Sequence, residues 1–427
     1  MSSFWKLTAF VVGCIAVTEP ALAQEKTECS ARITRSNLIP CTLASSLVVR
    51  SEQDTARALE GRRTAATPLL PSNPALAFTG ARRNATGTEP TAINWSATLS
   101  QELEVAGQRG KRLQEADAEV DAQRQRVLLS KRDTALLAWT AFYEVAAAQE
   151  EQVLSQRLLN ASQRMSEVTR AKTDKGLVAP LEADVAGAAT LRVLQSKLAA
   201  ERALSIAMAR LTFLLGRRSD AGSMTVEGDL TPLTNVTDAV AGLGSLSERP
   251  EMLIFDAERK AMTARAEAFR RSRIPNPTLS VFALNDGYNE RVYGVGIAFP
   301  IPLPTPVGRT YAGEIAEAEA LAQRAQTEQA RRGREIRLGV AAALATFAAH
   351  RQMVEALKPE ALQRAESTLR DLGQEIEAGR MAVRDALLAQ QTLIELLKTN
   401  IAERTALCLA SVELARALGL PLEKGAQ

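Results

Sequence analysis

Side chains that could perform catalysis or bind a metal are scarce in this chain of 427 residues. His350 is the single histidine, and the four cysteines are scattered as Cys14, Cys29, Cys41 and Cys408. The sequence contains no Ser-His-Asp set, no cluster with metal-ligand spacing and no phosphate-cradling glycine loop. A lone histidine on a helix is interpreted as a surface or packing residue. We therefore predict that the protein is not an enzyme and has neither a cofactor nor a resident metal.

Charge and composition exclude other classes of function. The formal net charge of +3 gives no reason to expect binding to nucleic acid. Charged residues make up 24% of the chain and aromatic residues only 4%. The apolar residues are largely Ala, Leu and Val. This composition predicts long helices that meet along narrow seams rather than a bulky globular core.

The first residues are typical of an export signal. Lys6 precedes an apolar run from Leu7 to Val17, and Ala21-Leu22-Ala23 has the small-x-small pattern of a cleavage site. We predict that residues 1–23 are a signal peptide and that the protein is exported, in a Gram-negative cell. No later stretch approaches the roughly 18 apolar residues of a transmembrane helix.

The cysteines allow further interpretations. Residues 11–14 could serve as a lipobox in which Cys14 is acylated, although the apolar run continues past Cys14 and favours cleavage after Ala23. Cys29 and Cys41 could pair in an oxidising compartment. Cys408 lies on an apolar helix face and is interpreted as a small core residue.

The chain contains an internal duplication. Residues 176–216 align without a gap with residues 379–419, at an offset of 203 residues. The same offset places Asn73-Pro74 on Asn276-Pro277. Each copy predicts a shorter helix, two strands opened by Asn-Pro, a very long helix, a glycine, and a second helix that ends at another glycine.

The duplication sets the expected division of the chain. We expect a first repeat at 24–216, a linker with at most short strands at 217–247, a second repeat at 248–420 and a tail at 421–427. The expected strands lie at about 74–82, 91–100, 277–284 and 291–300, and the long helices at about 108–174, 180–215, 313–378 and 382–418. The shorter helices are expected at about 43–66 and 248–273. A helix of about 65 residues would span on the order of 100 Å, which suits a tube rather than a compact domain.

The strands alternate apolar residues with small or polar ones. Leu279, Val281 and Ala283 show this pattern in the second repeat, and the first repeat shows a weaker version. Such strands suit the wall of a membrane barrel. Because a filled barrel needs about eight strands and lipid does not tolerate open edges, four strands predict that several copies of the chain build one barrel. A pair of β-hairpins on a soluble domain is the alternative.

Together, the export signal, the duplicated unit and the helix ends LTFLLG and LARALG resemble the outer membrane efflux proteins, the TolC-like channel subunits. The resemblance covers the chain from about Leu43 to Leu420. The stretches PSNPALAF, LSQELEVAGQRGKR, RIPNPTLSVF and FPIPLPTPVGRTYAGEIAEAEA are most similar to the heavy-metal branch of CzcC-like and CnrC-like proteins.

The resemblance implies a mixed α/β membrane protein that works as a homotrimer in the outer membrane. Each chain would give four strands to a twelve-stranded barrel, continued across the periplasm by a long α-helical barrel. The implied partners are a periplasmic adaptor (a membrane fusion protein) and an inner-membrane transporter of the resistance-nodulation-division (RND) class. The implied function is a passive conduit for heavy-metal cations such as cobalt, zinc, cadmium or nickel.

Other functions stay open at this point. A channel for drugs or organic compounds, or for type I secretion, would share the same architecture. A periplasmic coiled-coil adaptor is the alternative from another class, although adaptors usually have one hairpin flanked by β-domains.

In this family the helical hairpin tips carry glycine, then apolar and small residues, with an acidic residue six positions after the glycine. The matching residues are Gly176, Leu177, Val178 and Glu182 in the first tip and Gly379, Arg380, Met381 and Asp385 in the second. Glu182 stands where the family often has Asp. Glycine permits a left-handed reversal, and an acid suits the first turn of the next helix. Because apolar residues stand at solvent-facing turns, we expect the tips to dock the adaptor; pure turn geometry is the alternative.

Acidic residues near the second tip allow another interpretation. Asp371, Glu375, Glu377 and Asp385 could form rings at the periplasmic entrance after threefold repetition and attract cations. A solvated helix face is the alternative.

Three aromatic residues lie in or next to the expected strands. Trp95, Tyr293 and Phe299 are expected either in the aromatic girdle of the barrel or in ordinary strand packing.

Overall fold

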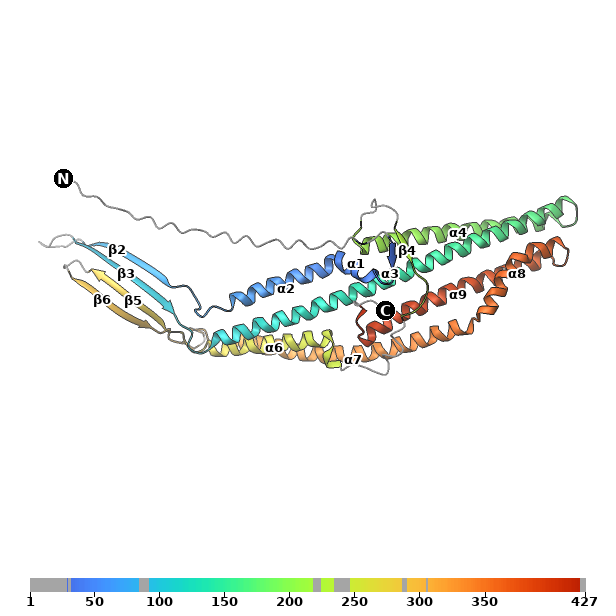
Figure 1. Ribbon diagram of the computed structural model, residues 1–427. Helices are drawn as coiled ribbons and strands as arrows, with labels where there is room; N and C mark the ends of the chain where they lie inside the picture. The colour runs from blue at the N-terminus through green and yellow to red at the C-terminus, as the bar shows by residue number, and fades with distance from the viewer. Residues whose placement is uncertain are drawn as a thin grey trace, which may run out of the picture.

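The molecule is elongated, with a four-stranded sheet at one end and two helical hairpin tips at the other (Figure 1). This computed structural model describes residues 29, 32–83, 92–217, 224–233, 246–285, 290–304 and 306–422. The expected signal peptide at 1–23 and the alternative lipid site at Cys14 lie outside the described residues, as does most of the expected tail.

Both repeats contain two strands, long helices and a reversal between them. The first half of the chain has β1 (Arg32–Thr34), α1 (Leu38–Ser45), α2 (Leu47–Ala65), β2 (Ala75–Arg83), β3 (Ala92–Glu102), α3 (Gln108–Asp174) and α4 (Pro180–Leu214). It is followed by β4 (Thr225–Glu227), η2 (Leu246–Glu248), α6 (Pro250–Arg271), β5 (Thr278–Asn285), β6 (Arg291–Ala298), α7 (Ala312–Ala356), α8 (Pro359–Glu377) and α9 (Val383–Leu418).

Helix α3 is continuous over 67 residues. At about 1.5 Å per residue it spans about 100 Å. It is rich in Ala, Glu, Gln, Arg and Leu, which are strong helix formers, and it contains no proline. The flanking Gly107 and Gly176 have φ values of 73° and 70°, so the chain enters and leaves the helix through left-handed residues. None of the described helices combines the length and apolar character needed to cross a bilayer.

The sequence predicted one helix over residues 313–378, and that prediction is wrong. Helix α7 ends at Ala356 and α8 begins at Pro359, after Lys358 with the extended angles φ −59° and ψ 135°. Proline lacks an N–H and clashes with the preceding turn, so it is accommodated as the first residue of a new helix. The first repeat has Gln156 at the corresponding position, and α3 runs through it unbroken.

The helix expected at about 43–66 is also divided. Ser46 separates α1 from α2 with the extended angles φ −65° and ψ 113°. Its side-chain oxygen accepts a hydrogen bond from the Val49 N–H at 3.3 Å. Serine is therefore the N-cap of α2, a role that its short hydroxyl side chain favours.

One antiparallel sheet contains the strands in the order β2-β3-β5-β6. Leu99 of β3 lies opposite Leu76 of β2 on one side and Val281 of β5 on the other, and Val281 lies opposite Val295 of β6. Opposed residues share a face, so one apolar face runs through all four strands. The other face has mainly small or polar residues, among them Ala77, Thr98, Ser100, Ser280 and Gly296.

Strand β6 ends at Ala298, two residues before the expected end. In the segment that follows Ala298, every second residue is a proline, beginning with Pro300 and Pro302. Because proline cannot donate to a strand ladder, the pairing with β5 ends here.

A hydrophobic core lies around the middle of α3, where α1, α9 and the segment after α4 meet it. Trp139, Phe142 and Tyr143 are completely buried, and their ring centroids lie 5.8 to 5.9 Å apart. Cys408 of α9 is buried in the same core, and burial raises the pKa of its thiol to about 12. It is a core residue and stays protonated at neutral pH.

The expected linker contributes to this core. Strand β4 lies parallel to β1, with Val226 opposite Ile33, and Leu230 and Leu233 are buried. On the N-terminal side, Cys29 and Cys41 form a disulfide with their Cα atoms 5.5 Å apart. The segments before α1 and after α4 are thus held together against the long helices.

Buried charged groups join the two repeats. Arg132 Nη1 of α3 lies 3.2 Å from Glu251 Oε1 of α6, and both side chains are more than nine-tenths buried. Arg132 Nη2 donates to the carbonyl oxygen of Arg416 in α9 at 2.7 Å. Arg249 donates to the same carbonyl at 3.1 Å and to that of Ala417 at 2.8 Å. Three helices therefore meet at one hydrogen-bonded centre.

Candidate functional site at the helical hairpin tips

At the first tip, α3 and α4 are joined by a Schellman reversal. The N–H of Gly176 donates to Thr173 O and that of Leu177 donates to Lys172 O, both at 2.9 Å. A Cβ at Gly176 would meet no atom within 4 Å, so the left-handed φ of 70° is what requires glycine. Pro180 then occupies the first turn of α4, where a missing N–H costs nothing.

Between α8 and α9, the second tip repeats this geometry. Gly379 has φ 72°, and its N–H donates to Ile376 O at 3.0 Å. The N–H of Arg380 donates to Glu375 O at 3.0 Å. The duplicated sequence therefore folds twice into the same reversal, and Figure 1 shows both tips at the same end of the molecule.

The apolar residues of the tips differ in exposure. Leu177 is 69% exposed, whereas Val178 and Met381 are partly buried against one cluster. That cluster consists of Met165, Leu372, Ile376, Val383, Ala386 and Leu387. Val178 and Met381 therefore pack the two hairpins against each other, and Leu177 is the one of these three predicted contact residues that lies at the surface.

A contact that sequence reasoning missed links the tips. Lys172 Nζ of α3 donates to the carbonyl oxygen of Ile376, in the last turn of α8. A cation there complements the partial negative charge of the helix C-terminus. The partners are far apart in sequence, and a lysine near a helix end carries no signal that identifies a distant carbonyl.

The acidic residues at the second tip are in different environments. Arg380 Nε and Nη2 each lie 2.7 Å from an oxygen of Glu375, and this hydrogen bonding lowers the pKa of the carboxyl. Asp371 and Glu377 are exposed on α8. The charge of Glu375 is therefore compensated locally, whereas Asp371, Glu377 and Asp385 are exposed.

Both tips place their predicted acid in the first turn of the next helix. Glu182 lies in the first turn of α4 and Asp385 in that of α9. The N-cap residues Ala179 and Ala382 have no side chain that could cap. A carboxylate near this helix end is stabilising by roughly 0.3–1 kcal/mol, so a structural role is present whatever binds the tip.

The single histidine has a partner within the fold. His350 Nδ1 of α7 lies 2.9 Å from Glu403 Oε2 of α9. Among the residues that the structure describes, no group of three or more His, Cys, Asp or Glu side chains is placed to hold a metal ion. The pair joins two neighbouring helices.

Aromatic residues occupy the apolar face of the sheet and its continuation. Trp95 stacks on Phe78 with ring centroids 6.4 Å apart. Tyr293 and Phe299 are exposed. Because they are exposed, the rings of Tyr293 and Phe299 can contact whatever medium surrounds the sheet.

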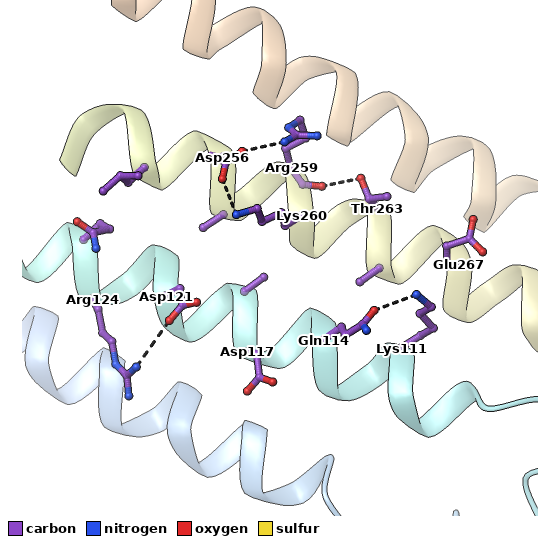
Figure 2. A pocket seen from close by; sticks show the side chains of 15 residues that line it. Lys111, Gln114, Asp117, Asp121, Arg124, Asp256, Arg259, Lys260, Thr263 and Glu267 are labelled. Carbon is purple, nitrogen blue, oxygen red and sulfur yellow. Dashed lines mark hydrogen bonds and ion pairs between the residues drawn. The ribbon is translucent and has the colours of Figure 1, made fainter. Parts of the chain in front are cut away.

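A groove of about 580 Å³ lies between α3 and α6, away from the tips (Figure 2). Asp256 lies 2.7 Å from Lys260 and 2.8 Å from Arg259, and hydrogen bonds from these two residues lower its pKa. On α3, Arg124 lies 3.6 Å from Asp121. Arg124 also lies 3.3 Å from Glu60 of α2, so these lining charges are paired within α6, within α3 or with α2.

Comparison with known proteins decides the family. The model of the outer membrane efflux protein family matches residues 44–217 and 244–420, which is most of the chain. This chain belongs to the outer membrane efflux protein family. The efflux protein therefore lies in the outer membrane, with its long helices extending into the periplasm, and it is a transport conduit.

Solved structures share this fold. The efflux protein superposes on CusC with a TM-score of 0.73 and 16% identity, covering 90% of this chain and 92% of that one. For VceC from Vibrio cholerae the values are 0.72 and 17%, covering 90% and 96%. For the CmeC outer membrane channel of Campylobacter jejuni they are 0.73 and 12%, covering 92% and 86%. No curated protein matches the sequence.

Proposed function

We propose that the efflux protein is one subunit of a trimeric outer-membrane channel in a tripartite efflux system powered by an RND transporter. The open four-stranded sheet carries this proposal. Its edge strands β2 and β6 have no strand partner on their outer sides within the described part of the chain. Unpaired strand edges are not tolerated in lipid, so β2 of one subunit pairs with β6 of the next, and three subunits close a twelve-stranded barrel.

The two faces of the sheet support the same arrangement. The apolar face with Leu76, Leu99, Val281 and Val295 faces lipid, and the face with Thr98 and Ser280 lines a polar lumen. The family assignment and the sheet argue against a coiled-coil adaptor, since the strand pairs and long hairpins occur twice in one chain.

We further propose that the tips dock a periplasmic adaptor, through the exposed Leu177 in particular. Leu177→Glu should lower resistance to the exported substrate, because a charge replaces an exposed apolar contact. The variant should no longer crosslink to the adaptor, while the amount of trimer stays unchanged. Growth in the presence of substrate and in vivo crosslinking measure the two effects.

Leu47→Glu is the matched control, because Leu47 is equally exposed, at 73%, and lies at the start of α2, away from the tips. It should leave resistance and the crosslink unchanged. Normal efflux and crosslinking in Leu177→Glu would exclude Leu177 from docking and leave the tips with a role in turn geometry.

The substrates proposed are heavy-metal cations such as cobalt, zinc, cadmium or nickel. The support is the similarity of four stretches to the CzcC-like and CnrC-like branch, together with the exposed Asp371 and Glu377 near the entrance. Rings of acids would raise the local concentration of cations. A channel needs no tight binding site for its cargo, and energy comes from the inner-membrane partner.

Deleting the gene tests this proposal. Tolerance to at least one of these four metals should fall severalfold, and a plasmid copy should restore it. Minimum inhibitory concentrations should be measured for the metals and for a panel of organic drugs. A fall confined to the drugs would favour the alternative of drug efflux and contradict the metal assignment.

A further inference from the structure

The disulfide between Cys29 and Cys41 closes a short loop, with a sequence separation of 12 residues. Cys41 lies in α1, is 4% exposed, and belongs to the hydrophobic core around the middle of α3. Cys29 is partly buried and packs against the same core. Burial within a single chain is retained when chains assemble, so the position of the disulfide does not depend on the oligomeric state. The loop is therefore anchored in the interior of the helical region.

The closed loop carries β1, whose partner strand β4 is remote in sequence. Ile33 of β1 is completely buried and lies opposite Val226 of β4. An ion pair joins Arg32 to Glu227 at a sequence separation of 195 residues. Each of the two strands has three residues, and together they form a sheet of two strands. A strand pair this short is not stable by itself, and bringing such distant segments together costs conformational entropy.

The turn after β1 contacts both the aromatic centre of the core and the linker. Arg35 Cζ lies 5.6 Å from the ring centroid of Trp139 and 5.9 Å from that of Tyr143. Arg35 Nη2 donates to the Tyr143 hydroxyl at 3.2 Å, and Nη1 lies 3.6 Å from Asp229 Oδ1 of the linker. The Tyr143 hydroxyl in turn donates to the carbonyl oxygen of Thr231 at 2.8 Å. A turn inside the disulfide loop thus joins the linker to helix α3.

The linker fits closely on the core beyond this turn. Gly228 approaches Phe142 so closely that a Cβ on the glycine would lie 2.2 Å from the ring. The N–H of Leu233 donates to Ser411 Oγ of α9 at 3.0 Å, and this hydrogen bond is buried. Amides of this kind are protected from solvent while the linker lies on the core. Their exchange with deuterium therefore reports whether residues 224–233 are in place.

The cysteines of the exported chain permit one pairing. Cys14 is removed with the signal peptide or acylated under either prediction. Cys408 is completely buried, and burial raises the pKa of its thiol to about 12, so it does not supply the thiolate that disulfide exchange requires. Cys29 and Cys41 precede the long helices in the sequence and reach the periplasm before them. Because Cys41 is buried in the folded chain, its oxidation must occur before the core closes.

We propose that a periplasmic thiol oxidase introduces the Cys29–Cys41 disulfide during export, and that this disulfide holds the linker on the aromatic core. The Cys29 thiolate attacks the disulfide of the oxidase, and a mixed disulfide forms as one oxidase thiolate leaves. The Cys41 thiolate then attacks the Cys29 sulfur and displaces the second oxidase thiolate. Two electrons and two protons pass from the cysteine pair to the oxidase, which is left as a dithiol. The disulfide restricts the unfolded segment, so β1 pairs with β4 at a lower entropic cost.

Thiol trapping in cells tests how and when the disulfide forms. After denaturation, protein from untreated cells should react with a maleimide-polyethylene glycol at Cys408 alone. In cells that lack the oxidase, or that receive dithiothreitol before synthesis, Cys29 and Cys41 should react as well, and the amount of protein in the outer membrane should fall several-fold. Dithiothreitol added after assembly should leave both measurements unchanged. Reaction of Cys29 and Cys41 in protein from untreated cells would overturn the proposal.

Hydrogen–deuterium exchange on the purified protein tests what the disulfide does. In Cys29→Ser with Cys41→Ser, the amides of residues 224–233 should exchange about tenfold faster than in the wild type, because the linker leaves the core more often. The amides of α6 should be unchanged. Cys408→Ala is the matched control, because it removes a buried sulfur from the same core without affecting the disulfide. It should retain wild-type exchange in the linker.

A second preparation keeps the test available if the double variant accumulates poorly. Wild-type protein is reduced in mild denaturant, returned to buffer and measured in the same way. Unchanged exchange at residues 224–233 in both preparations would show that the disulfide does not hold the linker. Equal acceleration in Cys408→Ala would assign the effect to core packing and also overturn the proposal. These exchange measurements concern contacts within one chain, so their outcome is separate from that of the trimeric channel proposed above.

Discussion

Replacing Val281 with arginine is expected to prevent the efflux protein from accumulating as folded trimer in the outer membrane. Val281 is at the centre of the apolar face, between Leu99 and Val295, and is 59% exposed in the single chain. A charge on a lipid-facing strand costs about 2–4 kcal/mol near the middle of the bilayer. In a trimer the cost is incurred three times, which makes this the largest effect that we expect from one substitution on the sheet.

Ser280→Arg is the matched control, because Ser280 is the next residue of β5 and points to the opposite face. An arginine there would face the lumen and should leave trimer formation largely intact. Membrane fractionation and the heat-sensitive trimer band on gels measure both variants. Equal assembly of Val281→Arg and Ser280→Arg would contradict the assignment of the two faces.

Arg132→Met is expected to be the most destabilising change among the charged residues of the helical region. It would remove the nearer of the two guanidinium groups that face the buried Glu251, leaving Arg249 Nε at 4.0 Å, and would remove the hydrogen bond to Arg416 O. Removing one partner of a buried ion pair typically costs about 3–5 kcal/mol. The midpoint of thermal loss of helicity for the purified trimer should fall by several degrees, as followed by circular dichroism.

The double variant Arg132→Met with Glu251→Leu tests whether the buried charge of Glu251, deprived of Arg132, is the cause. Replacing both partners by apolar residues removes the buried charge and should recover much of the lost thermal stability. An exposed pair provides the control: Arg57→Met breaks the contact with Asp54, both largely exposed, and should change the midpoint little. If Arg132→Met were as stable as the native protein, the pair would not hold the repeats together.

Local features of the sequence were sufficient to predict much of the architecture. The alternation around Val281 predicted the strands, and the register shows the apolar residues on one face. Gly176 and Gly379 predicted two matching reversals, which the backbone angles confirm. These features can be predicted because strand alternation and left-handed backbone conformations are determined by a few neighbouring residues.

Where the prediction failed locally, the sequence still contained the reason. Pro359 interrupts the expected helix 313–378, because proline in a helix interior removes a hydrogen bond and clashes with the preceding turn. The long alanine-rich pattern on both sides suggested continuity. The break shows that one residue with a fixed backbone overrides the helix propensity of its neighbours.

Contacts between distant segments could not be predicted. Val178, Met381 and Leu177 are all apolar residues at a hairpin tip, so the sequence does not distinguish them. In the structure, Val178 and Met381 pack between the hairpins while Leu177 stays exposed. Likewise, no pattern around Lys172 or Arg132 identifies Ile376 O or Glu251 as the partner. Such pairings depend on which helix faces meet in space.

The sequence by itself determined that this protein is an exported, duplicated chain of strand pairs and very long helices that reverse at two glycines. Periodicity, proline and glycine act through local backbone geometry, so their structural consequences can be predicted without knowledge of the fold. Only the tertiary structure decided which tip residues are exposed and which charges are paired across the repeats. These properties arise where segments from distant parts of the chain come together, and no single segment encodes them.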